Sequence, residues 1–365
     1  VLFLCGDLMT GRGIDQVLPH PGDPRLYEAS VKSATEYVKL ARMANGPIPQ
    51  PVSFSYIWGR ALQEFERVAP DVKIINLETS VTTSDDYWQG KAVNYRMHPK
   101  NIGCLIAAGI DHCSLANNHV LDWGYRGLTE TLETLKKAGI NAAGAGQNLK
   151  EASKPALIQV EGKGRVIVFS LGSTTSGIPY NWAASENRPG VSLLENFSES
   201  TVERIKEKIQ KVKRDRDIVV VSIHWGDNWG YEVPQEQRAL AHQLIDRAGV
   251  DLIHGHSSHH VKGVEVYKDR LILFGCGDFL NDYEGISGYE AYRPDLSLMY
   301  FASVDPSTGK LAALEMTPTQ VKRFRVSRVS REDALWLRDT LNREGQRFGT
   351  RTRLNDHNIL TLQWK

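Results

Sequence analysis

The chain opens with VLFLCGD (residues 1–7), a short apolar run that ends in glycine and aspartate. Two further polar groups follow apolar runs in the same way: ANNH at residues 116–119 and GHSSH at residues 255–259. In open α/β sheets, ligands bind beyond the carboxyl ends of the strands. These strand ends are therefore the first candidates for a functional site, and together we interpret them as a dispersed metal site.

Short β-rich apolar runs alternate with longer amphipathic segments along the chain, which is the pattern of an α/β fold with helices packed on sheets. We expect strands near residues 1–6, 72–76, 111–115, 155–160, 164–171, 217–223, 250–254, 263–267, 270–275 and 298–304. We expect helices near residues 54–68, 99–109, 124–138, 198–214, 234–248 and 331–345.

Two segments do not fit this alternation. Residues 13–50 contain several prolines and an Asn45-Gly46-Pro47 break, so we expect a long excursion over the mouth of the strand ends. Residues 281–297 combine aromatic and acidic side chains with glycines, as a binding loop would. No repeat or low-complexity linker divides the chain. We therefore expect one domain at residues 1–325 and a C-terminal helical extension packed on it at residues 326–365.

The composition is that of an ordinary globular protein of 365 residues. Its 44 lysines and arginines balance 43 aspartates and glutamates, so no electrostatic argument favours nucleic acid or an anionic membrane as partner. The four cysteines form no CxxC pair, which argues against zinc-ribbon or thioredoxin chemistry. No apolar run reaches the roughly 20 residues of a membrane helix, so we expect a soluble chain with no transmembrane segment and no leader. Val1 lies inside an expected strand, so a leader or anchor removed before it stays an alternative.

Two more expected strands end in ligand-type side chains: NLE at residues 76–78 and HWGD at residues 224–227. Carboxylate, imidazole and amide oxygen form the ligand set of divalent metals such as Zn, Mn or Fe. Two such metals about 3.5–4 Å apart can clamp the attacking and the leaving oxygen of a displacement. The five strand ends together therefore predict a hydrolase site.

Each strand end also has a simpler explanation. Gly6-Asp7 is an ordinary turn dipeptide, and Asn117-Asn118 tolerates the left-handed backbone of a loop. The histidine of His224-Trp225-Gly226 could be incidental to the packing of the tryptophan. The histidines of residues 255–260 are the hardest to explain in this way, because neighbouring imidazoles are costly when protonated unless a ligand uses them.

The polar segments occur in an order that resembles a known family. They are GDLMTGR (6–12), NLET (76–79), ANNHVLDWG (116–124), HWG (224–226), GHSSH (255–259) and LFGCGDF (273–279). Their succession over roughly residues 1–285 resembles the bacterial CapA-type poly-γ-glutamate capsule synthesis family. This resemblance implies the fold of the calcineurin-like metallophosphatase superfamily, a two-sheet sandwich flanked by helices in α-β-β-α layers, with a metal centre at the strand ends.

The resemblance also implies roles for single residues. The implied metal ligands are Asp7, Glu78 as the bridging acid, Asn118, His224, His256 and His259. His119 resembles the histidine that protonates a leaving group or steadies a phosphoryl oxygen. Met9 stands where the metallophosphatase pattern has a histidine, and a thioether is a poor ligand for a hard metal. The spacing of His256 and His259 is also one residue longer than in that pattern. We therefore expect one or two divalent metal ions, of the Mn, Zn or Fe type.

The placement of charged and aromatic residues predicts further site residues. Arg12 could hold a phosphate or carboxylate with its planar guanidinium, or form a salt bridge to Glu78 or Asp122. Asp122 could orient His119 or cap the helix that opens near Trp123-Gly124. His119, Asp122 and Arg12 are thus the candidate catalytic residues. The predicted substrate-binding residues are Arg96, Asn117, Trp225 and Tyr283.

The resemblance implies a role in making or handling poly-γ-glutamate, or a related acidic polymer, at the bacterial cell envelope or outside the cytoplasmic membrane. One hypothesis is a metal-dependent hydrolase or transferase that acts on a phosphoryl or γ-glutamyl (acyl) substrate, with His119 donating a proton and Arg12 holding the anion. The alternative is a non-catalytic component that binds the acidic γ-glutamyl polymer beside other capsule-synthesis proteins. Small phosphorylated or peptidic substrates are further candidates.

Overall fold

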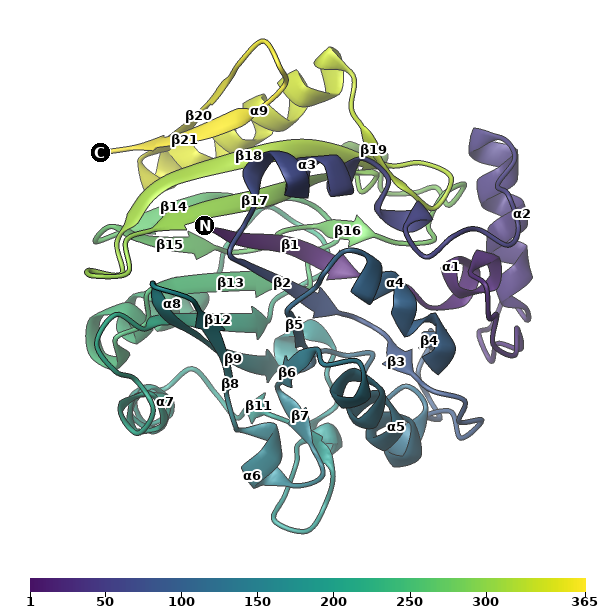
Figure 1. Ribbon diagram of the computed structural model, residues 1–365, viewed down its shortest axis with the longest axis horizontal. Helices are drawn as coiled ribbons and strands as arrows, with labels where there is room; N and C mark the ends of the chain where they lie inside the picture. Colours follow the sequence, from purple (N-terminus) through teal and green to yellow (C-terminus); the bar gives the residue numbers. More distant parts are fainter.

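The computed structural model describes residues 1–365 and contains two large β-sheets (Figure 1). The larger sheet has the order β20 (Thr350–Leu354), β21 (Leu360–Trp364), β18 (Leu311–Val321), β17 (Leu296–Val304), β1 (Leu2–Leu8), β2 (Val72–Leu77), β5 (His112–Ser114) and β6 (Asn141–Ala143). In addition, β16 (Asp278–Leu280) pairs with β1, and β19 (Val326–Arg328) pairs with β18.

The smaller sheet has the order β11 (Leu193–Leu194), β9 (Gly164–Ser173), β12 (Ile218–His224), β13 (Leu252–His256), β15 (Arg270–Leu273) and β14 (Val264–Tyr267), with β8 (Ala156–Val160) paired to β9. Two short pairs complete the β-structure: β3 (Ser80–Val81) with β4 (Arg96–Met97), and β7 (Ala145–Gly146) with β10 (Gly190–Val191). The α-helices are α1 (Arg12–Val17), α2 (Ala34–Asn45), α3 (Arg60–Val68), α4 (Gly103–Ala107), α5 (Gly124–Lys137), α6 (Leu149–Ala152), α7 (Glu199–Gln210), α8 (Gln235–Ala248) and α9 (Arg331–Gly345). The prediction of a mixed α/β fold is confirmed.

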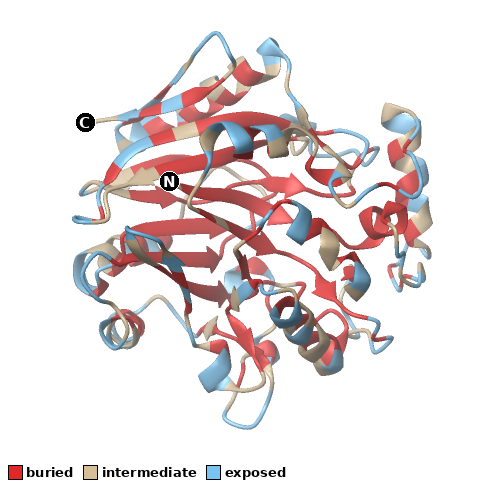
Figure 2. Ribbon diagram, in the orientation of Figure 1, coloured by how far each residue is buried: buried red, intermediate tan, exposed pale blue.

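The period-two alternation of the strands divides the core between the layers. In β1, Leu2 and Leu4 belong to a buried cluster that also takes side chains from β9, β12 and β13, whereas Phe3 and Cys5 join a cluster shared with α3, α4 and α5. The outer face of the smaller sheet packs on α7 and α8 in a third cluster. The two sheets therefore pack against each other, and helices cover their outer faces. Figure 2 shows the result as buried central strands inside partly exposed helices.

The strands that carry the polar ends run in one direction. In the larger sheet, β1 is parallel to both β2 and β16, and in the smaller sheet β12 is parallel to β13. Their carboxyl ends lie on the same side of the molecule (Figure 1). A Cβ atom on Gly6 would lie 1.6 Å from the carbonyl oxygen of Gly277, so the close approach of β1 to β16 requires glycine at this position.

Each strand and helix that the sequence predicted overlaps an element of the structure, but the segment 13–50 differs from its prediction as a loop excursion. It contains most of α1 and the twelve-residue helix α2. The hydroxyl oxygen of Ser33 accepts from the backbone N–H of Thr35 at the start of α2, and Tyr37, Val38 and Ala41 bury one face of it. The flanking prolines obscured this short amphipathic helix.

The C-terminal residues contain more than the predicted helix. After α9, the hairpin of β20 and β21 joins the edge of the larger sheet through antiparallel pairing of β21 with β18 (Figure 1). Residues 326–365 therefore extend the larger sheet as well as adding a helix. No helix in the structure combines the length and the apolarity that a membrane crossing requires.

Candidate functional site

Asp7 lies at the centre of the site, where the carboxyl ends of the two sheets meet. The Nδ2 group of Asn76 donates to Asp7 Oδ1 at 2.7 Å and to Glu78 Oε2 at 3.2 Å. The backbone N–H of Ser257 donates to Asp7 Oδ2 at 3.2 Å, and Ser257 adopts a left-handed φ of 102° as the chain leaves β13. One amide thus holds Asp7 and Glu78 side by side. Both residues were predicted as metal ligands, which requires that they lie close together.

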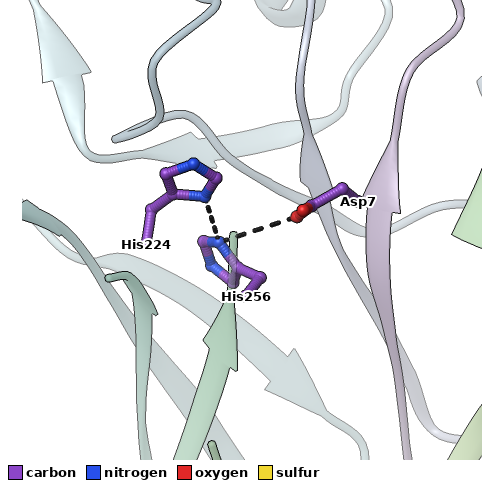
Figure 3. A group of neighbouring side chains, drawn as sticks. All are labelled: Asp7, His224 and His256. Carbon is purple, nitrogen blue, oxygen red and sulfur yellow. Dashed lines mark hydrogen bonds and ion pairs between the residues drawn. The ribbon is translucent and has the colours of Figure 1, made fainter. Parts of the chain in front are cut away.

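Two histidines from neighbouring strands of the smaller sheet face Asp7 (Figure 3). His224 and His256 are register partners in β12 and β13, and their Nδ1 atoms lie 2.8 Å apart. His256 Nδ1 lies 3.9 Å from Asp7 Oδ1, and Ser222 Oγ lies 2.9 Å from His256 Nε2. His224 Nε2 lies 3.1 Å from Asn118 Oδ1. Ligand atoms of Asp7, His224 and His256 all lie within 4.8 Å of one another.

A second group of ligand atoms also contains Asp7. Its other members are His259 and Asp278, and the three ligand atoms lie within 4.8 Å of one another. His259 Nδ1 lies 2.8 Å from Asp278 Oδ1, and the Asn281 amide donates to Asp278 Oδ2 at 2.8 Å. The carboxylate common to the two groups is therefore Asp7, not Glu78, to which the resemblance assigned the bridging position.

Burial sets the protonation of these groups. It raises the pKa of Asp7, with the negative charge of Asp278 as the next cause, and it raises the pKa of Glu78, with Asp7 as the next cause. Burial also lowers the pKa of His224 and of His256, so both imidazoles are neutral at pH 7. Neutral imidazoles beside carboxylates that are costly to ionise form a donor set that fits a divalent cation.

His119 lies beside these ligands as part of a separate hydrogen-bonded pair. Its Nδ1 atom lies 2.6 Å from Asp122 Oδ2, which also accepts from the backbone N–H of Tyr95 at 2.7 Å. The other nitrogen, Nε2, lies 3.8 Å from Glu78 Oε1. Burial lowers the pKa of His119 to about 4, and the charge of Lys91 opposes its protonation further. Asp122 therefore orients His119, which was one of its two predicted roles.

Two residues of the site were missed from the sequence. Asp278 lies beside Asp7, and the dipeptide Gly277-Asp278 repeats the Gly6-Asp7 pattern that identified the first strand end. Lys91 comes from the loop between β3 and β4, and its Nζ atom lies 2.5 Å from Asp122 Oδ1 and 3.3 Å from His119 Nδ1. No local pattern distinguishes Lys91 from other loop lysines.

Arg12 does not have a free guanidinium, which corrects its prediction as the holder of a substrate anion. Its Nε and Nη2 atoms donate to the two carboxylate oxygens of Asp282 at 3.1 and 2.5 Å. Its Nη1 atom donates to Glu28 Oε1 at 3.0 Å and to the Tyr37 hydroxyl at 2.9 Å. The alternative prediction of a salt bridge is correct in kind, but the partners differ from the two carboxylates expected. The side chain braces the long N-terminal segment against the loop after β16.

Three of the four predicted substrate-binding residues are engaged elsewhere. Trp225 is buried in the core on the helix-covered face of the smaller sheet, and its indole N–H donates to the Phe274 carbonyl at 3.0 Å. Arg96 donates to two backbone carbonyls and lies 3.7 Å from the ring centroid of Trp123. The Asn117 amide donates to the side-chain oxygen of Asn76 and the backbone oxygen of Leu77 at the carboxyl end of β2. These side chains hold the strand ends in place, because their polar groups already have partners.

Tyr283, the fourth, lines a cavity of about 640 Å³ beside the site. His259 and Arg12 line the same cavity, and so do Trp229 and Tyr289, whose stacked rings have centroids 3.9 Å apart. Residues 281–295 supply much of its wall. The segment that was expected to be a binding loop therefore borders both the ligand groups and a space large enough for a small molecule.

This α/β chain brings two carboxylates and three imidazoles together at the ends of its strands, in two groups that could hold a metal ion. Comparison with known proteins identifies the family of the chain. The chain belongs to the family described as bacterial capsule synthesis protein PGA_cap, whose family model matches residues 1–283. The CapA-type family that the order of the motifs predicted is thus confirmed.

Three relatives show how far the similarity extends. The chain is 47% identical over 362 residues to a probable polyglutamine synthesis accessory protein of Mycobacterium tuberculosis. The aligned residues cover 99% of this chain and 95% of that relative. It is 31% identical over 262 residues to the PGA biosynthesis protein CapA of Bacillus subtilis, covering 70% of this chain and 65% of the relative. It is 28% identical over 281 residues to the capsule biosynthesis protein CapA of Bacillus anthracis, covering 77% of this chain and 59% of the relative.

Proposed function

We propose that this chain is a metal-dependent hydrolase or transferase in the synthesis of a γ-linked glutamate polymer, acting on a phosphoryl or γ-glutamyl (acyl) group. The names of the relatives support the polymer, since they describe polyglutamine and PGA synthesis and capsule biosynthesis. The observation that carries the catalytic part is the convergence of two ligand groups on Asp7, next to the His119–Asp122 pair.

The arrangement of layers supports a likeness to the metallophosphatases. Two sheets pack face to face, helices cover both outer faces, and the polar groups lie at the carboxyl ends of parallel strands. These features support the layered architecture that the resemblance in sequence implied. Fold alone does not determine a reaction, so the chemistry has to be argued from the side chains.

The residues that would hold a divalent cation are Asp7, His224 and His256 with the Asn118 amide oxygen, and Asp7 with His259 on the other side. A bound cation of this kind polarises a phosphoryl or carbonyl oxygen and lowers the pKa of water. The imidazoles of His224 and His256 are neutral, so each can offer a lone pair without loss of a proton. Although burial opposes it, the charge of Asp278 raises the pKa of His259, so His259 would release a proton when it binds a cation.

His119 is the residue that moves a proton. Because Asp122 accepts from Nδ1–H at 2.6 Å, the lone pair of the imidazole is assigned to Nε2, the nitrogen that faces Glu78. Its pKa of about 4 makes it neutral at pH 7, so it first accepts a proton at Nε2 from the attacking water and then donates that proton to the leaving group. This refines the simple donor role that the sequence predicted.

The test uses the full chain, purified with its metal, and measures hydrolysis of aryl phosphates, phosphodiesters and γ-glutamyl peptides. We expect turnover of one class, its loss on chelation and its return on adding Mn²⁺ or Zn²⁺. We expect His119→Ala to lower kcat by about 10²–10⁴-fold, the usual contribution of general acid–base catalysis, with the metal content unchanged. The exposed His357→Ala is the matched control.

Two outcomes would contradict this proposal. Full turnover after complete removal of metal would show that the ligand groups have no part in the reaction. Saturable binding of poly-γ-glutamate with bound metal and no product from any substrate class would instead identify a polymer-binding component of a synthetic complex.

A further inference from the structure

We propose that a basic groove at the edge of the smaller sheet, separate from the strand-end site, binds an extended chain of carboxylates. The groove has a volume of about 1030 Å³ and is walled by α6, β11 and α7, in the lower part of Figure 1. None of the residues of the two ligand groups lines it. This inference rests on the proposed function only for the identity of the polymer, and it assigns a surface that holds the polymer.

The groove collects positive charge. The whole chain has a formal net charge of +1, so its cations are nearly balanced by carboxylates. In the groove the balance differs, because the cationic side chains outnumber the acidic ones. The lining cations are Arg204 and four groove lysines, Lys150, Lys154, Lys208 and Lys211, and the lining acids are Glu186 and Glu195.

The groove lysines have no acidic partner. Arg204 Nη1 lies 3.5 Å from Glu195 Oε2, but no carboxylate oxygen lies within 4.0 Å of the ammonium group of any groove lysine. Elsewhere on α7 the cations are paired, since Lys206 Nζ lies 3.0 Å from Glu203 Oε2. The lysines that line the groove are therefore free to bind an anion.

Three of the cations lie on one face of α7 and repel one another. Arg204, Lys208 and Lys211 are spaced i, i+4 and i+7, so they span about 10 Å along the helix axis. Burial lowers the pKa of Lys208, and the charges of Arg204 and Lys211 lower it further. The helix dipole favours cations in the last turn of α7, but it does not account for Arg204 in the middle of the helix or for Lys154 in the loop after α6. An anion in the groove would offset this repulsion.

The floor of the groove is apolar. Leu171, Leu194 and Ile205 are buried there, whereas most of the groove lysines are exposed at its rim. No aromatic side chain lines the groove, so it offers no ring on which a nucleic-acid base could stack. A concave apolar floor between cations suits a chain in which apolar segments alternate with negative charges, and it does not suit a flat membrane surface.

A γ-linked glutamate chain has this chemistry. Each repeat carries one carboxylate and two methylene groups. The methylene groups can pack on the apolar floor while the carboxylates face the groove lysines. The groove would then hold a stretch of polymer by both kinds of contact.

The experiment measures how the full chain, purified with its metal, binds a fluorescein-labelled γ-linked glutamate oligomer, with fluorescence anisotropy as the readout. We expect saturable binding that weakens with added salt, because salt screens exposed charges. The groove variant replaces the four groove lysines by glutamine, which has a helix propensity close to that of lysine. We expect its affinity to be lower by roughly tenfold or more, since four exposed charge pairs are lost.

Two control variants separate the groove from overall charge. Replacing the four groove lysines by arginine keeps the charge and is expected to keep the affinity. A charge-matched variant removes four exposed lysines outside the groove and is also expected to bind as the wild type does. Its substitutions are Lys100→Gln, Lys136→Gln, Lys137→Gln and Lys310→Gln. Circular dichroism establishes that each variant is folded, and Lys150→Gln with Lys154→Gln, which leaves α7 intact, replaces the groove variant if that variant does not fold.

The inference is wrong if the groove variant binds the oligomer as the wild type does, or if the charge-matched variant loses as much affinity. It is also wrong if the wild type binds phosphatidylserine vesicles through the groove lysines and does not bind the oligomer. Each of these results leaves the proposed function standing when metal-dependent turnover persists. Conversely, groove-dependent binding of the oligomer without turnover of any substrate would overturn the proposed function and leave this inference intact.

Discussion

Arg12 is a buried charged residue near the site, and its contacts indicate that it stabilises the fold and does not hold a substrate anion. Its side chain is 3% exposed, and it pairs with Asp282 and Glu28, whose side chains are 0% and 7% exposed. Replacing Arg12 by methionine keeps much of the side-chain volume but leaves two buried carboxylates without a cation. Removing one partner of a buried ion pair costs about 3–5 kcal/mol. We therefore expect Arg12→Met to destabilise the fold by that amount.

Urea unfolding, followed by circular dichroism, measures this loss. With a slope of about 3 kcal/mol per molar, the midpoint is expected to fall by roughly 1–1.7 M. Adding Asp282→Asn and Glu28→Gln in the same chain should restore most of the midpoint, because no unpaired charge is then buried. Arg25→Met, at an exposed pair with Asp23, is the control and should leave the midpoint unchanged.

The reasoning about Arg12 is refuted by one particular result. If Arg12→Met keeps the wild-type midpoint but loses affinity for an anionic substrate, the guanidinium holds the substrate and does not brace the fold. A loss of stability together with an unchanged metal content is what the contacts predict.

Four further predictions concern protonation, the orientation of His119 and packing. Burial, and next the charge of Asp278, raises the pKa of Asp7 to about 7, so a proton competes with the cation below that pH. Calorimetry should therefore show that the affinity for Mn²⁺ rises from pH 6 to 8. An affinity that does not change with pH would contradict this. Protonated Asp7 stabilises the metal-free protein at low pH, and this contribution is lost as the pH rises through 7. The melting temperature of metal-free protein should therefore fall as the pH rises to 7, whereas that of metal-loaded protein should not. Asp122→Asn should lower kcat toward the loss expected for His119→Ala without releasing metal, as elemental analysis would show. Trp225→Ala should cost about 3–5 kcal/mol in urea unfolding, and unchanged stability would argue against its burial in the core.

The central strands of both sheets could be predicted because each is a short apolar run bounded by polar residues. The alternation of Leu2 and Leu4 with Phe3 and Cys5 reflects two buried faces, which is why β1 reads as continuously apolar. The helix α2 was missed because its apolar face is narrow and lies between prolines. Strands β20 and β21 were missed because one face of each is exposed, so their apolar residues are few and spaced. Strand β18 was missed because polar residues interrupt its apolar ones, although most of the strand is buried.

In the candidate site, only residues that follow a recognisable local sequence pattern could be predicted. Asp7 and His256 follow recognisable apolar runs, whereas Asp278 lies in a strand of three residues that exists through its pairing with β1. The sequence left Arg12 open between a substrate anion and a salt bridge to Glu78 or Asp122, because its actual partner Asp282 is 270 residues away in the chain. Long-range ion pairs leave no periodic trace in the sequence, so a free charge and a paired one look the same.

The buried carboxylates of Asp7 and Asp278 connect the fold of this protein to its chemistry. Strand pairing brings Asp7 and Asp278 together in a buried position, and no lysine or arginine offsets the cost of ionising them. The folded chain without metal must therefore keep a proton on this pair, accept the repulsion between two anions, or hold a proton on His259, whose pKa the charge of Asp278 raises against the effect of burial. A divalent cation bound as proposed would offset these costs, and part of its binding free energy would then stabilise the contact between β1 and β16. Metal occupancy should consequently govern the stability of the strand ends as well as turnover, and the two effects should be lost together in Asp278→Asn.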